Sequence, residues 1–246
     1  MSNRFEPIAS YGQDRPSRLI LFPHTSYETF RSQEWIGREA EWFKIAAILH
    51  WSLSCIHDMS AASVLLLQPH SRHYAKNLSV PLGAGSVQEL SVPLAPSSEP
   101  LQPDLVEMLE RLGARPGASV DLIIATGLFS HGASEARESA LLRACRRVLK
   151  PGASLLATFP LQDDLGNPVT ARNIQFLDAA ERTGMQQSVI LGCQGLAGFL
   201  EDAFWARLRS QGHAAFDAVF HSLTTVTDLP ETLWMSSEAL YIGDKV

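Results

Sequence analysis

The feature that most constrains the fold is a strand–helix–strand pattern in the middle of the chain. Residues 120–125 (Val-Asp-Leu-Ile-Ile-Ala) and 154–159 are short apolar runs that predict two buried strands. Between them, residues 137–150 predict a helix with one apolar face. That face consists of Leu141, Leu142, Cys145, Val148 and Leu149. Pro151 and Gly152 end the helix, because proline cannot continue it and glycine accepts a left-handed turn. The pattern indicates an α/β fold.

Other segments extend this pattern along the chain. Further strands are predicted over residues 18–22, 63–67 and 87–92, while residues 188–191 fit either a strand or apolar packing. Helices are predicted within residues 27–57 and over residues 105–112, 171–182 and 196–210. Residues 215–226 and 239–243 predict an antiparallel hairpin that closes the sheet. We therefore expect an N-terminal arm and helical cap over residues 1–60 and one α/β domain over residues 61–246.

The composition argues against several classes of protein. The formal net charge of −6 and the sequence pI of about 5.7 disfavour a broad basic surface for nucleic acid. The first residues lack the apolar core of a signal peptide, and the longest apolar stretch, residues 45–56, is too short to span a membrane. The three cysteines are scattered along the chain and fit a reducing compartment. We therefore expect a cytoplasmic protein with no disulfide and no membrane span.

The order of elements between residues 118 and 160 resembles a known family. A strand, a loop with a histidine, an amphipathic helix, Leu-Lys-Pro-Gly and a second strand are similar to the second half of the class I S-adenosylmethionine (SAM)-dependent methyltransferase fold. In order of elements, the resemblance extends over roughly residues 60–243. It implies a doubly wound, Rossmann-like sheet that is mostly parallel, with a C-terminal antiparallel hairpin. It also implies SAM as the cofactor.

The place where this family binds SAM departs from the family pattern. The family's first strand ends in an acidic residue followed by a glycine-rich turn, whereas residues 64–73 here contain no glycine. Two interpretations stay open. SAM binds through an unusual loop formed by Leu67, Gln68, Ser71 and the backbone, or the pocket no longer binds it. The resemblance also assigns Glu89 as the acidic residue that accepts hydrogen bonds from the ribose hydroxyls.

The same loop carries three further polar residues, His70, Arg72 and His73. They favour an anion over the positively charged sulfonium of SAM, or they form a solvated loop. The glycines of Gly83-Ala84-Gly85 are no replacement for the missing turn, because no helix begins directly after them.

Candidate catalytic residues follow the strand at 120–125. Thr126, Gly127 and His131 come after its carboxyl end, where ligands bind in open α/β sheets. His131 is the candidate general base, although a histidine that packs on the following helix is the competing interpretation. Asp121 begins the same strand and is assigned a structural role. The eight histidines show no metal-ligand spacing, so we predict no metal site.

These features leave three hypotheses about function, of which the first two are the main ones. The first is a SAM-dependent methyltransferase that acts on a small-molecule or protein acceptor. The second is a non-catalytic, methyltransferase-like subunit that binds and stabilises a partner protein, or a homodimer. The third is a pocket of the same fold reused for cyclisation or another reaction without methyl transfer. Because a fold does not fix a function, the residues of the site must decide between them.

Overall fold

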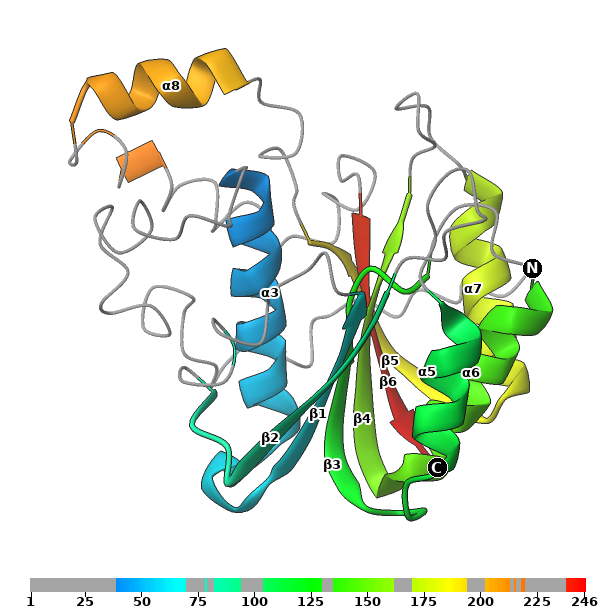
Figure 1. Cartoon of the computed structure of the whole chain (residues 1–246). Coiled ribbons are helices and arrows are strands. Elements are labelled where there is room, and N and C mark those ends of the chain that lie inside the picture. Colours follow the sequence, from blue (N-terminus) through cyan, green and yellow to red (C-terminus); the bar gives the residue numbers. More distant parts are fainter. Residues whose placement is uncertain are drawn as a thin grey trace.

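A six-stranded sheet forms the centre of the described part of the chain (Figure 1). The computed structural model describes residues 39–69, 78, 82–93, 104–129, 135–161, 170–193, 202–212, 215, 218–219 and 238–246. The strands are β1 (Ser63–Pro69), β2 (Ser86–Val92), β3 (Val120–Ala125), β4 (Leu149–Pro160), β5 (Met185–Gly192) and β6 (Glu238–Lys245). Their order across the sheet is β2-β1-β3-β4-β6-β5. Neighbouring strands from β2 to β4 run parallel, and β6 runs antiparallel to both β4 and β5.

Helices cover both faces of this sheet. Helix α3 (Glu39–Cys55) covers one face, which we call the α3 face, and α8 (Asp202–Ser210) lies on the same side, beyond the start of α3. Helices α5 (Leu105–Gly113), α6 (Glu135–Val148) and α7 (Thr170–Arg182) lie on the other, the α6 face (Figure 1). The short 3₁₀ helix η2 (Met59–Ala61) leads from α3 into β1. The predicted doubly wound α/β fold, mostly parallel with an antiparallel C-terminal strand, is confirmed.

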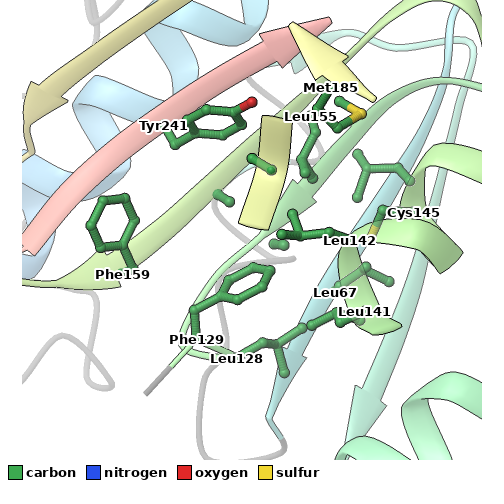
Figure 2. Packing of buried hydrophobic residues seen from close by; sticks show 14 of the residues in the cluster. Leu67, Leu128, Phe129, Leu141, Leu142, Cys145, Leu155, Phe159, Met185 and Tyr241 are labelled. Carbon is green, nitrogen blue, oxygen red and sulfur yellow. The ribbon is translucent and has the colours of Figure 1, made fainter. Parts of the chain in front are cut away.

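Alternation along the strands divides the core into two layers. In β1, Val64 and Leu66 pack on the α3 face, whereas Leu65 and Leu67 pack on the α6 face. Both sets are fully buried, which is why the strand reads as a continuous apolar run without alternating polar positions. Figure 2 shows part of the α6-face layer, in which Leu141, Leu142 and Cys145 of α6 meet side chains of the sheet.

Several predicted elements agree with the structure. Strand β3 has the predicted bounds, 120–125, and 188–191 belong to a strand, β5. Helix α5 begins after Asp104, whose Oδ1 accepts hydrogen bonds from the backbone N of Val106 and of Glu107. Helix α3 confirms the helical prediction for 39–55, but its described side chains are mostly buried, because it lies against the sheet. The segments 18–22, 27–38 and 196–201 lie outside the described residues.

The prediction of a closing hairpin is wrong for the first of its two strands. Strand β6 is antiparallel as predicted, but it pairs with β4 and β5 and lies between them. Within the predicted first arm, Ala215, Ala218 and Val219 are helical, and the other residues lie outside the described part. Alanine favours helix over strand, which agrees with the helical state of these described residues.

The α6–β4 junction also differs from the prediction. Helix α6 ends at Val148, two residues early, because Leu149 already pairs with Val120 of β3. The register then shifts, so that the next pair joins Leu122 and Ser154. Gly152, with φ of +74°, lies within the extra residues of this bulge. The Pro-Gly pair therefore bends a strand instead of ending a helix.

The glycines at 83 and 85 have a structural role at the amino end of β2. Gly83 has φ of +59°, and the backbone N of Gly85 donates to the carbonyl oxygen of Met59. A Cβ on Gly85 would lie 2.4 Å from the carbonyl oxygen of Ser60, so only glycine allows β2 to begin this close to η2. This edge of the sheet is opposite to the carboxyl ends of β1 and β3.

Asp121 also lies at the amino edge. Its Oδ2 accepts a hydrogen bond from the backbone N of Ser63, and Lys150 Nζ lies 2.9 Å from both carboxylate oxygens. Partial burial acts to raise the pKa of Asp121, but the hydrogen bonds from Lys150 and Ser63 outweigh it and hold the pKa below its usual value. The carboxylate thus joins the starts of β1, β3 and β4, in agreement with the predicted structural role.

Replacing Asp121 with asparagine is expected to lower the free energy of unfolding at pH 7 by about 1 kcal/mol. Because the native pKa lies below the unfolded value near 3.8, this stabilisation is complete above that pH and is lost as the pH falls through the native pKa. The difference between wild type and Asp121→Asn in urea denaturation should therefore shrink below about pH 4. A difference that stays constant from pH 7 to pH 3 would contradict this.

Candidate functional site

The strand order places a topological switch point between β1 and β3. The chain leaves β1 toward β2 on one side, and later returns to β3 on the other. In open α/β sheets such a point, at the carboxyl ends of the strands, is where ligands bind. The structure brings five predicted site residues together there. They are Leu67 and Gln68 at the end of β1, Glu89 of the neighbouring β2, and Thr126 and Gly127 directly after β3. Ser71 and His131 lie outside the described residues, as do His70, Arg72 and His73.

The backbone joins the two strands at this point. The backbone N of Thr126 donates to the carbonyl oxygen of Leu67 over 2.9 Å, which extends the β1–β3 pairing by one residue. The Leu67 side chain is buried in the α6-face core and is not directed at a ligand. Leu67 therefore contributes its backbone to the edge of the sheet, while Gln68 begins the polar part.

Gln68 and Glu89 form a direct hydrogen bond. Gln68 Nε2 donates to Glu89 Oε1 over 2.7 Å, from a buried amide to an exposed carboxylate. Glu89 is opposite Leu66 in the β1–β2 register, three residues before the end of β2. A carboxylate offers about four acceptor positions, so this bond leaves capacity for hydroxyl donors of a ligand. The bond fixes the orientation of the carboxylate at the same time.

Among the described strand residues at the carboxyl edge, the polar side chains lie on the α3 face. We call Glu89, Gln68, Thr158 and Glu238 the polar row; they come from β2, β1, β4 and β6. On the same face, the next positions away from the carboxyl edge are apolar, namely Leu66, Leu156 and Leu240. On the α6 face, the residues at this level are Leu67, Ala157, Phe159 and Ala239. This asymmetry indicates that a polar ligand at the switch point would meet the α3 side of the sheet.

A buried ion pair forms the end of the polar row. Lys44 Nζ of α3 lies 2.9 Å from Glu238 Oε1 and 2.8 Å from Oε2, and the Lys44 side chain is 2% exposed against 21% for Glu238. A buried ammonium is costly without a carboxylate partner. The pair therefore ties α3 to the start of β6 at the carboxyl edge of the sheet.

Sequence reasoning missed Lys44, Thr158 and Glu238. Lys44 carried a usable signal, because it is a charged residue inside the apolar helical stretch that contains Ile45, Ala47 and Ile48. Such a lysine requires a buried partner. Nothing local in the sequence identifies Glu238 as that partner, since the two residues are 194 positions apart.

The turn after β3 crosses from one face of the sheet to the other. Gly127 has φ of +65°, a conformation that other residues adopt at a cost. Its backbone N lies 3.3 Å from Thr158 Oγ1 and donates to it. Leu128 and Phe129 then insert into the α6-face core (Figure 2). There the Phe129 ring packs edge-on against the ring of Phe176. The turn is therefore held on both sides of the sheet.

Other chemistry has little support among the described residues. No group of three or more His, Cys, Asp or Glu side chains in this part of the chain is arranged to hold a metal ion. Full burial raises the pKa of the Cys145 thiol to about 12, so it is protonated at neutral pH and does not act as a nucleophile. No helix in the described ranges is long and apolar enough to cross a membrane.

Comparisons with known proteins find similarity in structure only. No protein-family model and no curated protein sequence matches the chain. A SAM-dependent methyltransferase from Archaeoglobus fulgidus has a TM-score of 0.46 at 13% identity, with 89% of this chain and 100% of that chain covered. The [4+2]-cyclase SpnF has a TM-score of 0.47 at 13% identity, over 81% of this chain and 80% of that one.

A third similar structure is geranyl diphosphate C-methyltransferase from Streptomyces coelicolor A3(2), in complex with Mg²⁺, geranyl diphosphate and S-adenosyl-L-homocysteine. It has a TM-score of 0.44 at 11% identity, over 82% of this chain and 79% of that one. At such values the comparisons say nothing about cofactor or substrate. The fold rests on the strand order, with its switch point between β1 and β3 and its antiparallel C-terminal strand. The protein has a class I methyltransferase-like fold.

Proposed function

We propose that this protein binds SAM at the carboxyl edge of β1, β2 and β3 and transfers its methyl group to a small-molecule or protein acceptor. The observation that carries the proposal is the hydrogen-bonded pair of Gln68 and Glu89 at the topological switch point, where the polar row meets the carboxyl end of β1. When bound, SAM supplies a methyl group on a positively charged sulfonium. The chain's own residues bind and orient the reactants, which is the main requirement of a direct transfer.

The residues at the edge fit parts of this cofactor. The exposed Glu89 carboxylate, oriented by Gln68, suits the two hydroxyl donors of a ribose. Gly127 brings the backbone after β3 to the edge in a left-handed conformation. Pro69 has no backbone N–H, so the end of β1 offers carbonyl groups and the Gln68 side chain in place of glycine contacts.

The remaining assignments extend the proposal beyond the described residues. Ser71 is proposed as a further cofactor contact and His131 as the general base for the acceptor. The division into an N-terminal arm and cap over 1–60 and a domain over 61–246, and a cytoplasmic location, stay predictions of the sequence.

Titration calorimetry with S-adenosylhomocysteine tests the proposal, after the purified protein has been checked for bound ligand. Wild type should bind with a micromolar Kd, and saturation at 100 times Kd should stabilise the fold by about 2.7 kcal/mol. Replacing Glu89 with alanine should weaken binding about tenfold or more, because one charge-assisted hydrogen bond contributes about 1.5–3 kcal/mol.

The matched control is Gln88→Ala. Gln88 is an exposed neighbour on the same strand, and alternation places it on the opposite face from Glu89. The Kd of Gln88→Ala for S-adenosylhomocysteine should equal that of wild type. A folded, ligand-free wild type that does not bind S-adenosylhomocysteine would contradict the proposed function and leave the partner-subunit hypothesis to be tested by co-purification.

A further inference from the structure

We propose that Thr158 is a positioning residue for the ligand site. Its hydroxyl holds the Gly127 turn in the shape that the site needs, although Thr158 itself lies inside the sheet. This inference rests on the proposed function for its ligand, but the turn can also be tested without one.

The first argument is the way in which the chain is held after β3. Two successive backbone amides beyond the end of this strand donate to its two neighbours. The N of Thr126 donates to the Leu67 carbonyl of β1 over 2.9 Å, and the N of Gly127 donates to Thr158 Oγ1 of β4 over 3.3 Å. Because β3 lies between β1 and β4, the turn is fixed from both sides.

The second argument is the chemistry of the position. Thr158 is 1% exposed, and its neighbours on the α3 face, Leu156 and Leu240, are apolar. Valine has nearly the same shape and fits a strand equally well. Burying a hydroxyl instead is unfavourable unless a hydrogen bond compensates for it. The bond from Gly127 supplies that compensation and explains the threonine.

The third argument is the conformation that the bond holds. Gly127 has φ of +65°, and the next two residues are anchored in the α6-face core. Without the bond from Gly127 to Thr158, the turn keeps its anchors at Leu67 and Phe129 but loses its fixed point between them. A site that is already in its binding shape binds its ligand more tightly, because less ordering is needed.

The test compares two buried hydroxyls of the same strand. Thr158→Val removes the acceptor and keeps the shape, while Thr158→Ser keeps the acceptor. The control, Ser154→Ala, removes a hydroxyl four residues earlier in β4, away from the carboxyl edge, that donates to Asp244 Oδ1. Two quantities are measured: hydrogen exchange of the Gly127 amide by NMR, and the Kd for S-adenosylhomocysteine by calorimetry.

We expect Thr158→Val and Ser154→Ala to lower the Tm by similar amounts. Only Thr158→Val should speed exchange of the Gly127 amide and weaken binding, each by about tenfold, and Thr158→Ser should restore both. If Thr158→Val does not fold, Thr158→Ala with its smaller side chain is measured in the same way.

Each outcome decides a different claim. Wild-type exchange at Gly127 in Thr158→Val overturns the inference, whether or not the ligand binds. If exchange of the Gly127 amide is faster in Thr158→Val but the Kd is unchanged, Thr158 holds the turn in place, but the turn has no role in ligand binding. If wild type does not bind S-adenosylhomocysteine, the proposed function fails and the role in ligand binding fails with it, while exchange at Gly127 still decides whether Thr158 holds the turn.

Discussion

Replacing Glu238 with alanine is expected to lower the free energy of unfolding by about 3–5 kcal/mol. The change removes the carboxylate that neutralises Lys44, whose side chain is almost fully buried between α3 and the sheet. The double variant Lys44→Met/Glu238→Leu should recover most of this loss, because an apolar pair of similar size avoids the buried charge. Chemical denaturation of the three proteins at pH 7 measures the difference.

The matched control for this prediction is a surface pair. Arg182 Nη2 and Glu135 Oε1 lie 2.6 Å apart, but their side chains are 59% and 58% exposed. Glu135→Ala should therefore change the free energy of unfolding by less than about 1 kcal/mol. If Glu238→Ala costs no more than Glu135→Ala, the Lys44 ammonium is not buried in solution as it is in the structure.

The second large effect is expected at Phe176. Its ring stacks on Phe159 at 4.4 Å between centroids and meets Phe129 and Tyr241 edge-on at 5.0 and 5.2 Å. Phe176→Ala should cost about 3–5 kcal/mol, because it removes a fully buried ring and leaves a cavity among three others. Figure 2 shows three of these neighbours, Phe129, Phe159 and Tyr241, in the α6-face core.

Ile174 on the same helix provides the control. Its side chain is 60% exposed, so Ile174→Ala should change the free energy of unfolding by less than about 0.5 kcal/mol. Thermal and urea unfolding of both variants separates core packing from helix propensity, because each change introduces alanine into α7. Equal losses at the two positions would show that the aromatic cluster does not hold α7 to the sheet.

The parts of the fold that depend on local pattern could be predicted from the sequence. Strand β3 and helix α6 have apolar runs and spacings that only one kind of element satisfies, so the sequence predicts the bounds of both within two residues. The start of β4 lies five residues before the predicted position, because the bulge at Pro151 and Gly152 belongs to the strand. The place of β6 could not be predicted in the same way. Its pairing with β4 and β5 depends on residues far away in the chain, and a period of two does not say which strands are neighbours.

The candidate site shows the same limit. Gln68 and Glu89 were both named from the family resemblance, but the hydrogen bond between them requires the register that sets Leu66 opposite Glu89. Thr158 is hidden in an apolar run, where a single hydroxyl gives no sign of its partner. Lys44 and Glu238 come into contact only once the whole fold has formed, because they are 194 residues apart in the chain. Contacts of this kind depend on packing between distant segments, so a local pattern can mark one residue, as at Lys44, but does not identify its partner.

The place of β6 also has a consequence for how the protein is made. A ribosome releases β4 and β5 well before residues 238–245, yet these two strands are joined only through the strand that comes last. Before β6 is released, β4 and β5 each have an unpaired edge. Unpaired strand edges can form hydrogen bonds with other chains and so promote aggregation. Premature termination before residue 238 would therefore yield an aggregation-prone chain with two open strands, and a nascent chain that still holds these residues in the exit tunnel would be in the same state.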